Sequence, residues 1–280
     1  MAFTLNSNIT IGQFKKVKPN EVKIQLAISN YVNTCKIKLP ASAHLVCENK
    51  AEKTNTVQTA QQFKEGDKVV VQLGYNGILK TEFTGFVARI NIATPVEVEC
   101  EGYSYQLRKK TPAPKTFKKA ELKEVLKYII TGTDIVLDAD IQGCVLEKIV
   151  INGHNGVEVL ELIKKTLGDL VFMHFHNNVL YAGLTFLNPQ QTVKYQLGWN
   201  VIKDNNLKQR QAKNDKITIV YKGKKKDGSN VQAVLKSKGQ SKVITTEGEA
   251  GNGGETKTIV THSVTDEATL KKMAEAKLKN

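Results

Sequence analysis

The first third of the chain is dominated by an alternation of apolar and polar positions that is typical of half-buried β-strands. Apolar residues alternate from Val69 to Leu73 and lead to Asn76-Gly77, a dipeptide that readily adopts the positive φ angles of a type I′ turn. A return strand should begin at Ile78. The pattern over residues 66–105 therefore predicts antiparallel sheet.

The alternation continues along the next two predicted strands. One face of the first is expected to carry Phe86, Ala88, Ile90 and Ile92. In the second, apolar Val96, Val98 and Cys100 alternate with Glu97, Glu99 and Glu101. The three glutamates have the spacing of the solvent side of a sheet, where they repel one another unless lysines of a neighbouring strand lie between them.

Two earlier strands complete a first β-module. Their alternating apolar residues are Val22, Ile24, Leu26 and Ile28 in one strand, and Cys35, Ile37 and Leu39 in the other. Pro40 ends the second strand, because proline cannot donate to a sheet. Residues 41–64 are polar and rich in Thr and Gln, which favours a surface connection over a packed element.

The middle of the chain combines helical and strand patterns. Two prolines and a basic cluster in residues 108–115 indicate an extended linker and a domain boundary. Apolar spacings of three and four predict a helix over 122–130. A second helix should begin at Gly156, with Asn155 as its N-cap, Glu158 completing a capping box and Gly168 ending it.

Strands are expected around these helices and again near the C-terminal end. Short strands are predicted over 135–137 and 145–151, and a hairpin over 170–183 should turn at Asn177-Asn178. After Gln191 the alternation predicts strands over 217–221, 231–235 and 258–262, with a flexible loop at 247–254. A Lys-rich helix should follow over 266–279.

These patterns together predict an α+β fold that is mainly β. We expect two barrel-like antiparallel β-modules with an α+β insertion between them. The boundaries are a first barrel-like module over residues 1–110, the insertion over 111–190, and a second barrel-like module over 191–280 that ends in a helix.

The chain is strongly basic, but few of its basic residues are of the type that recognises nucleic-acid sequence. Its net charge is +14, and only Arg89, Arg108 and Arg210 are arginines among the 41 basic residues. A diffuse lysine surface gives solubility and salt-sensitive attraction to polyanions, whereas base reading favours the guanidinium fork. Specific nucleic-acid recognition is therefore not expected.

An alternative function is a basic barrel-type module that binds single-stranded nucleic acid. Such a module needs aromatic residues interleaved with basic ones on one face. Tyr103 and Tyr105 alternate beside Arg108, Lys109 and Lys110, which is the best local match.

Neither a catalytic centre nor a metal centre is predicted. Cys35, Cys47, Cys100 and Cys144 form no C-x-x-C pair and are interpreted as free thiols. His174 and His176 share a strand face and could reach His154, but histidines on a partly exposed sheet explain them better. Asp134, Asp138 and Asp140 do not have the spacing of the oxygen ligands in a calcium-binding loop. The glycines of 247–254 do not have the pattern of a phosphate-binding loop.

We therefore assign no catalytic, cofactor-binding or metal-binding residue, expect no cofactor, and expect no enzyme. The sequence also contains no apolar run long enough for a membrane span.

Several short motifs give the chain a family resemblance. They are Gly66-Asp67-Lys68-Val69, Leu73-Gly74-Tyr75, Phe83-Thr84-Gly85-Phe86-Val87 followed by Ile90, Val96 to Cys100 leading into Glu101-Gly102-Tyr103, and Val179-Leu180-Tyr181-Ala182-Gly183. In these motifs and in the order of its modules, the chain resembles the baseplate hub proteins of contractile phage tails. That family includes late control protein D and the hub part of type VI secretion spikes.

The resemblance implies a structural role in a virion tail baseplate, assembled in the cytoplasm of the bacterial host. Two barrel-like modules per subunit would form a homotrimeric ring of pseudo-sixfold symmetry, which adapts the tail tube to the central spike. The implied partners are the spike protein and the tail tube or tape-measure proteins. Because the family's second barrel usually continues past a helix like the C-terminal one here, this module is either cut short or completed by a partner chain.

Overall fold

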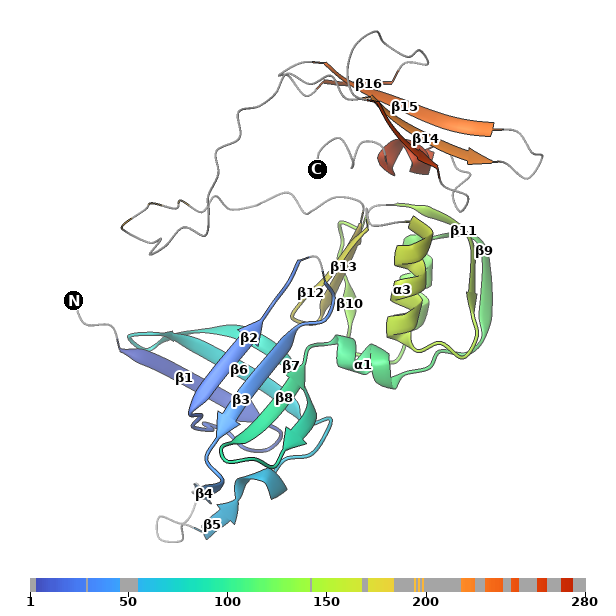
Figure 1. The fold of residues 1–280 in the computed structure, drawn as a ribbon. Helices are drawn as coiled ribbons and strands as arrows, with labels where there is room; N and C mark the ends of the chain where they lie inside the picture. Colours follow the sequence, from blue (N-terminus) through green and yellow to red (C-terminus); the bar gives the residue numbers. More distant parts are fainter. Residues whose placement is uncertain are drawn as a thin grey trace.

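The computed structural model describes most of the N-terminal two thirds of the chain and parts of the rest. It covers residues 4–28, 30–45, 55–141, 143–167, 171–183, 194, 196, 198, 218–224, 230–238, 243–246, 256–260 and 268–273, the four ranges from 218 to 260 as backbone only. Figure 1 shows a curled N-terminal sheet, an α+β region beside it and a further sheet near the C-terminal end. The expected fold class, α+β and mainly β, is confirmed.

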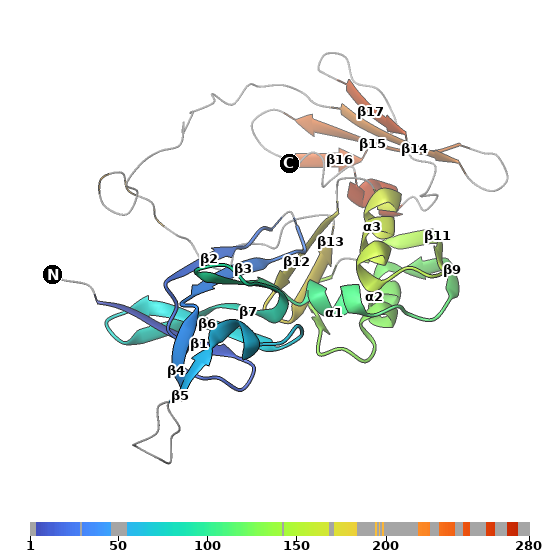
Figure 2. The ribbon, with the colours of Figure 1, turned by 60° about the horizontal axis from the view of Figure 1, so that its bottom comes forward.

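The first sheet contains six antiparallel strands and curls into a half-barrel (Figures 1 and 2). Its strands are β1 (Leu5–Ile11), β2 (Glu21–Gln25), β3 (Thr34–Leu39), β6 (Lys68–Tyr75), β7 (Ile78–Asn91) and β8 (Val96–Glu101). The spatial order β1-β6-β7-β8-β3-β2 makes β1 and β2 its outer strands. The predicted turn is confirmed, because Asn76 and Gly77 have φ angles of +52° and +83°.

The apolar alternation of the sequence builds the core of this half-barrel. The alternate positions of β3, β6 and β8 are buried, as predicted. The strand predicted over 22–28 is shorter than its pattern, since β2 ends at Gln25 and leaves Leu26 and Ile28 55% and 59% exposed.

The predicted shared face of Phe86, Ala88, Ile90 and Ile92 is wrong. Phe86 packs in the core of the α+β region, whereas Ile90 packs against the core of the half-barrel. The cause is a break in the pairing of β7 with β8 between Val87 and Arg89, because one extra residue in a strand turns the following side chains to the other face.

The predicted surface connection over 41–64 contains packed structure. Its elements are β4 (Ser42–Leu45), β5 (Asn55–Gln58) and the short 3₁₀-helix η1 (Thr59–Gln61). β4 and β5 pair with each other, and Phe63 is buried with its ring edge-on to Phe14, at 5.6 Å between centroids. Phe63 therefore packs part of this segment against the core, although the polar composition of the segment predicts a surface connection.

The α+β region follows directly from β8. Its elements are α1 (Ser104–Lys109), β9 (Lys115–Glu121), α2 (Leu122–Ile130), β10 (Val136–Leu137), β11 (Val145–Ile151), α3 (Gly156–Leu167), β12 (Phe172–His176) and β13 (Val179–Gly183). Both predicted helices, both short strands and the hairpin turning at Asn177 are confirmed, and Asn177 has a φ of +52°. Gly168 lies outside the described residues.

The capping box of α3 is formed as predicted. The Glu158 backbone N–H donates to Asn155 Oδ1 at 3.0 Å, and the Asn155 N–H donates to Glu158 Oε2 at 2.8 Å. Strand β9 was not expected, because only Phe117 and Ala120 are buried along it and their spacing is not that of a strand. It pairs with β11, and a positive φ of 54° at Lys119 distorts it.

A four-stranded sheet is described near the C-terminal end. It contains β14 (Thr218–Lys224), β15 (Asn230–Lys238), β16 (Val243–Thr246) and β17 (Thr256–Val260) in the order β16-β15-β14-β17. Three of these strands overlap those predicted, and β16 is additional. β14 and β17 run parallel, whereas the other pairs are antiparallel.

Residues 268–273 form part of the predicted C-terminal helix and pack against the α+β region. Leu270 and Met273 belong to its hydrophobic core. Lys272 Nζ donates to the carbonyl oxygen of Gly143 at 2.6 Å, and the Val145 N–H donates to Thr269 Oγ1 at 3.2 Å. Residues 268–273 thus bring the chain back to the α+β region.

Glycine is required at one close approach between β7 and β8. A Cβ atom on Gly85 would overlap the carbonyl oxygen of Glu101 and would lie 2.7 Å from Cζ of Phe83. Replacement by alanine therefore forces two paired strands apart within the core.

We predict that Gly85→Ala lowers the free energy of unfolding by about 1–3 kcal/mol, measured by urea denaturation followed by circular dichroism. Gly143→Ala is the matched control, because the nearest atom that its Cβ would meet is Lys272 Nζ at 3.7 Å. Equal midpoints for the two variants would contradict the packing described for Gly85.

Candidate functional site

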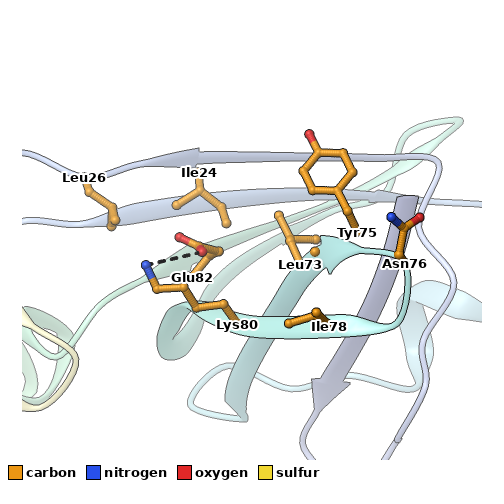
Figure 3. A pocket seen from close by; sticks show the side chains of 9 residues that line it. Ile24, Leu26, Leu73, Tyr75, Asn76, Ile78, Lys80 and Glu82 are labelled. Atoms are coloured by element: carbon orange, nitrogen blue, oxygen red, sulfur yellow. Dashed lines mark ion pairs between the residues drawn. The ribbon is translucent and has the colours of Figure 1, made fainter. Parts of the chain in front are cut away.

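An open groove lies between β2 and the β6–β7 hairpin of the half-barrel (Figure 3). Its volume is about 870 Å³. It is lined by Ile24, Leu26, Leu73, Gly74, Tyr75, Asn76, Ile78, Lys80 and Glu82. One wall is therefore β2 with the residue after it, and the other is the β6–β7 hairpin.

The hairpin wall carries an apolar row at its tip. Strand register places Leu5 opposite Tyr75, and Tyr75 opposite Ile78, so that one row crosses β1, β6 and β7. These side chains are 76%, 57% and 81% exposed, respectively. Large exposed apolar side chains that gather in one place mark an interaction surface more often than isolated ones do.

Hydrogen bonds hold the tip of the hairpin against β1. The backbone N–H of Thr4 donates to Asn76 Oδ1 at 3.0 Å, and the Gly77 N–H donates to Asn6 Oδ1 at 2.8 Å. The Asn76 N–H also donates to the carbonyl oxygen of Thr4, at 2.9 Å. The turn that carries the apolar row is thus held in place by hydrogen bonds to Thr4 and Asn6.

The groove is nearly free of net charge. Its two charged lining residues are Lys80 and Glu82, whose Nζ and Oε1 atoms are 3.9 Å apart. In Figure 3 this ion pair lies at one end of the groove, and Tyr75 and Asn76 lie at the other. Ile24 is the β2 residue nearer Leu73, whereas Leu26 lies beyond it, on the side of the ion pair.

The structure does not gather the histidines considered for a metal site. His174 and His176 share a face of β12, as predicted, and the His174 ring lies 5.1 Å from that of Tyr181. Burial lowers the pKa of His174. The Asn152 N–H donates to Nδ1 of His154, and within the described ranges no group of three His, Cys, Asp or Glu residues could hold a metal ion.

The aspartates near β10 are engaged in turns. Gln106 exchanges two hydrogen bonds with Asp134, one from its Nε2 to Oδ1 at 2.8 Å and one to its Oε1 from the Asp134 N–H at 3.2 Å. The Asp140 N–H donates to Asp138 Oδ1 at 2.8 Å. The interpretation of these residues as polar turns around a strand agrees with this geometry.

Lys36 of the neighbouring strand β3 lies between two of the three glutamates of β8 and relieves the repulsion expected from their spacing. Lys36 Nζ lies 3.1 Å from Glu97 Oε1 and 3.0 Å from Glu99 Oε1, and its hydrogen bond lowers the pKa of Glu99. The solvent position predicted for Glu101 is wrong, because it is buried. It accepts hydrogen bonds from Ser104, at the start of α1, and from Arg108, in the last turn of α1.

The aromatic residues proposed to stack nucleic-acid bases do not form an open face. Tyr103 and Tyr105 lie at the start of α1 instead of on a strand, and both rings contact Phe86. Tyr103 is buried, and Arg108 pairs with Glu101 at 3.0 Å. The best local match for single-strand binding is therefore part of the packing between β7 and α1.

The described cysteines are buried thiols. Cys35 and Cys100 are cross-strand neighbours on β3 and β8, and burial raises the pKa of Cys35 to about 12. Burial also raises the pKa of Cys144, to about 11. Cys47 lies outside the described residues.

Comparison with solved structures identifies the fold. No protein-family model and no curated protein sequence matches the chain. The crystal structure of the 43 kDa tail protein of prophage MuSo2 from Shewanella oneidensis is similar over 97% of this chain and 77% of that one, with a TM-score of 0.53 and 16% identity. A tail protein from Neisseria meningitidis is similar over 98% of this chain and 76% of that one, with a TM-score of 0.53 and 13% identity.

The chain has the fold of these phage tail proteins. The similarity extends over both the half-barrel and the α+β region, since it covers nearly the whole chain. The Francisella PdpA-VgrG complex is also similar, with a TM-score of 0.41 and 10% identity over 95% of this chain and 42% of that one.

Among the described helices of this tail-protein fold, none has the length and apolar character needed to cross a bilayer.

Polar contacts join the half-barrel to the α+β region. The Tyr31 hydroxyl, just before β3, donates to Glu161 Oε1 on α3. Burial, reinforced by the hydrogen bond to Glu161, raises the pKa of Tyr31. Nearby, Asn33 Nδ2 donates to the carbonyl oxygen of Phe175 at 3.1 Å. These bonds hold the segment before β3 against two elements of the α+β region.

We predict that Tyr31→Phe lowers the free energy of unfolding by about 1–3 kcal/mol at pH 7, since it removes a hydrogen bond to a carboxylate. Because the folded-state pKa of Tyr31 is raised, its contribution is complete below the ordinary tyrosine pKa of about 10 and decreases as the pH rises above it. The difference between wild type and variant should shrink from pH 9 to pH 11.

Urea denaturation at several pH values measures this difference, and Glu161→Ala combined with Tyr31→Phe completes a double-mutant cycle. A difference that stays constant from pH 7 to pH 11, or an additive cycle, would contradict the contact.

Proposed function

We propose that this chain is a structural protein of a contractile phage or prophage tail and that it forms the baseplate hub. The observation that carries the proposal is the similarity of fold to the Shewanella prophage tail protein over 97% of the chain. The role is assembly and load-bearing, without catalysis. Its place would be the virion tail baseplate, after assembly in the bacterial cytoplasm.

The proposed assembly is a homotrimeric ring between the tail tube and the central spike. We propose the division anticipated from the sequence, with a barrel-like module over 1–110, an insertion over 111–190 and a second barrel-like module over 191–280. Two such modules in each of three subunits give pseudo-sixfold symmetry, which adapts a sixfold tube to a threefold spike. The partners would be the spike protein and the tube or tape-measure proteins.

Two features of the half-barrel support an assembly role. β1 and β2 are outer strands of a curled sheet, and an outer strand offers backbone groups to another chain. The row of Leu5, Tyr75 and Ile78 adds an apolar surface that is exposed to water and would be stabilised by contact with another chain.

We predict that the purified chain forms trimers. Light scattering should give a mass of about 93 kDa, which is three times the 31.0 kDa of one chain. Negative-stain microscopy of the same sample should show rings. A stable monomer of 31.0 kDa would contradict the proposal, and if that monomer bound single-stranded DNA with a steep salt dependence, the basic binding module would replace it.

A further inference from the structure

The part of the chain that the structure describes contains three Asn-Gly dipeptides, at residues 76–77, 152–153 and 155–156. In such a dipeptide the glycine N–H gives up its proton, its nitrogen bonds to Cγ of the asparagine side chain, and the side-chain nitrogen leaves as ammonia. Glycine offers no side chain to hinder this attack. Water then opens the resulting succinimide ring and leaves aspartate or isoaspartate. Each dipeptide is therefore a candidate for spontaneous deamidation.

Hydrogen bonds oppose this reaction at Asn76-Gly77. The Gly77 N–H, which has to lose its proton and turn towards the Asn76 side chain, donates to Asn6 Oδ1 at 2.8 Å. The Asn76 side chain is held as well, because its Oδ1 accepts a hydrogen bond from the Thr4 N–H at 3.0 Å. Attack would break both bonds, so the folded turn protects this dipeptide.

Asn155-Gly156 is protected in a similar way at the start of α3. Gly156 is buried, and its N–H donates to the carbonyl oxygen of Lys110, the residue after α1, at 3.0 Å. Asn155 is the N-cap of α3, and its Oδ1 accepts a hydrogen bond from the Glu158 N–H at 3.0 Å. Ring closure would therefore break both the cap and the contact of α3 with the chain after α1.

Asn152-Gly153 lacks both restraints. The two residues are exposed in the connection between β11 and α3. The described residues give neither the Asn152 side chain nor the Gly153 N–H a hydrogen-bond partner, since the bond of Asn152 to His154 Nδ1 comes from its backbone N–H. A Cβ atom on Gly153 would meet no atom within 4 Å, so the surroundings also leave space for ring closure.

We propose that Asn152 is a site of spontaneous deamidation, whereas the fold protects Asn76 and Asn155. The inference goes beyond the proposed function and does not depend on it. The reaction lowers the net charge of +14 by one, and isoaspartate also adds one carbon atom to the backbone between β11 and α3. Both ends of that connection are fixed, by buried Ile151 and by the capping box of α3, so residues 152–155 have to accommodate the extra atom.

The first test follows the folded, full-length chain over time at mildly alkaline pH. Deamidation should be at least about tenfold faster at Asn152 than at Asn76 or Asn155, because only the latter two must first lose hydrogen bonds. Peptide mapping by mass spectrometry measures the three rates, and fragmentation of the tryptic peptide 149–164 separates Asn152 from Asn155. Asn252, which also precedes a glycine and lies outside the described residues, falls in another peptide.

The same chain unfolded in guanidinium chloride is the control for the local sequence. Without the fold, the three described dipeptides should deamidate at similar rates. If Asn152 leads by the same margin in the unfolded chain, its sequence neighbours explain the difference and the proposal is overturned. Rates in the folded chain that are equal at the three sites, or lowest at Asn152, overturn it as well.

A second test removes one protecting hydrogen bond. Asn6→Ala deprives the Gly77 N–H of its acceptor and should accelerate deamidation at Asn76 severalfold, with the rates at the other two sites unchanged. Asn8→Ala is the matched control, because Asn8 lies on the same strand and its Nδ2 donates to Gln72 Oε1 instead of to the turn. Both variants should keep the circular dichroism spectrum of the wild type. An unchanged rate at Asn76 in folded Asn6→Ala would contradict the protection on which the proposal rests.

Discussion

The fold depends on the fact that one strand has to serve two cores. β7 contributes Phe83 and Val87 to the half-barrel and Phe86 to the α+β region. An ordinary strand can do this on its two faces, but β7 must also keep Ile90 against the half-barrel, and the irregular pairing after Val87 makes that possible. Phe86 contacts the rings of both Tyr103 and Tyr105, so the helix that follows β8 is fixed to the sheet by aromatic contacts.

The same junction explains why Glu101 is buried. Its carboxylate leaves the regular alternation of β8 at the point where α1 begins, and Arg108 and the Ser104 hydroxyl satisfy its oxygens there. A buried carboxylate held in this way cannot easily be moved without leaving a charge uncompensated. The direction of α1 relative to the half-barrel is therefore set by hydrogen bonds as well as by packing.

Local signals in the sequence were sufficient for elements whose determinants are local. The Asn76-Gly77 turn and the Asn155 and Glu158 capping box depend on a few adjacent residues, and each formed as expected. The irregular pairing of β7, the pairing of lysine-rich β9 with β11 and the burial of Phe63 depend on partners distant in sequence. The groove was missed for the same reason, although the alternation that runs on to Leu26 and Ile28 was a visible sign of apolar surface beyond the strand.

The return of residues 268–273 to the α+β region has a mechanical consequence. The chain leaves that region after β13 and comes back to it where Leu270 and Met273 enter the core and Lys272 binds Gly143. The four-stranded sheet from β14 to β17 is thus tethered at both its beginning and its end to one body. To move that sheet far from the α+β region, a force must therefore also pull Leu270 and Met273 out of the hydrophobic core and break the hydrogen bond of Lys272.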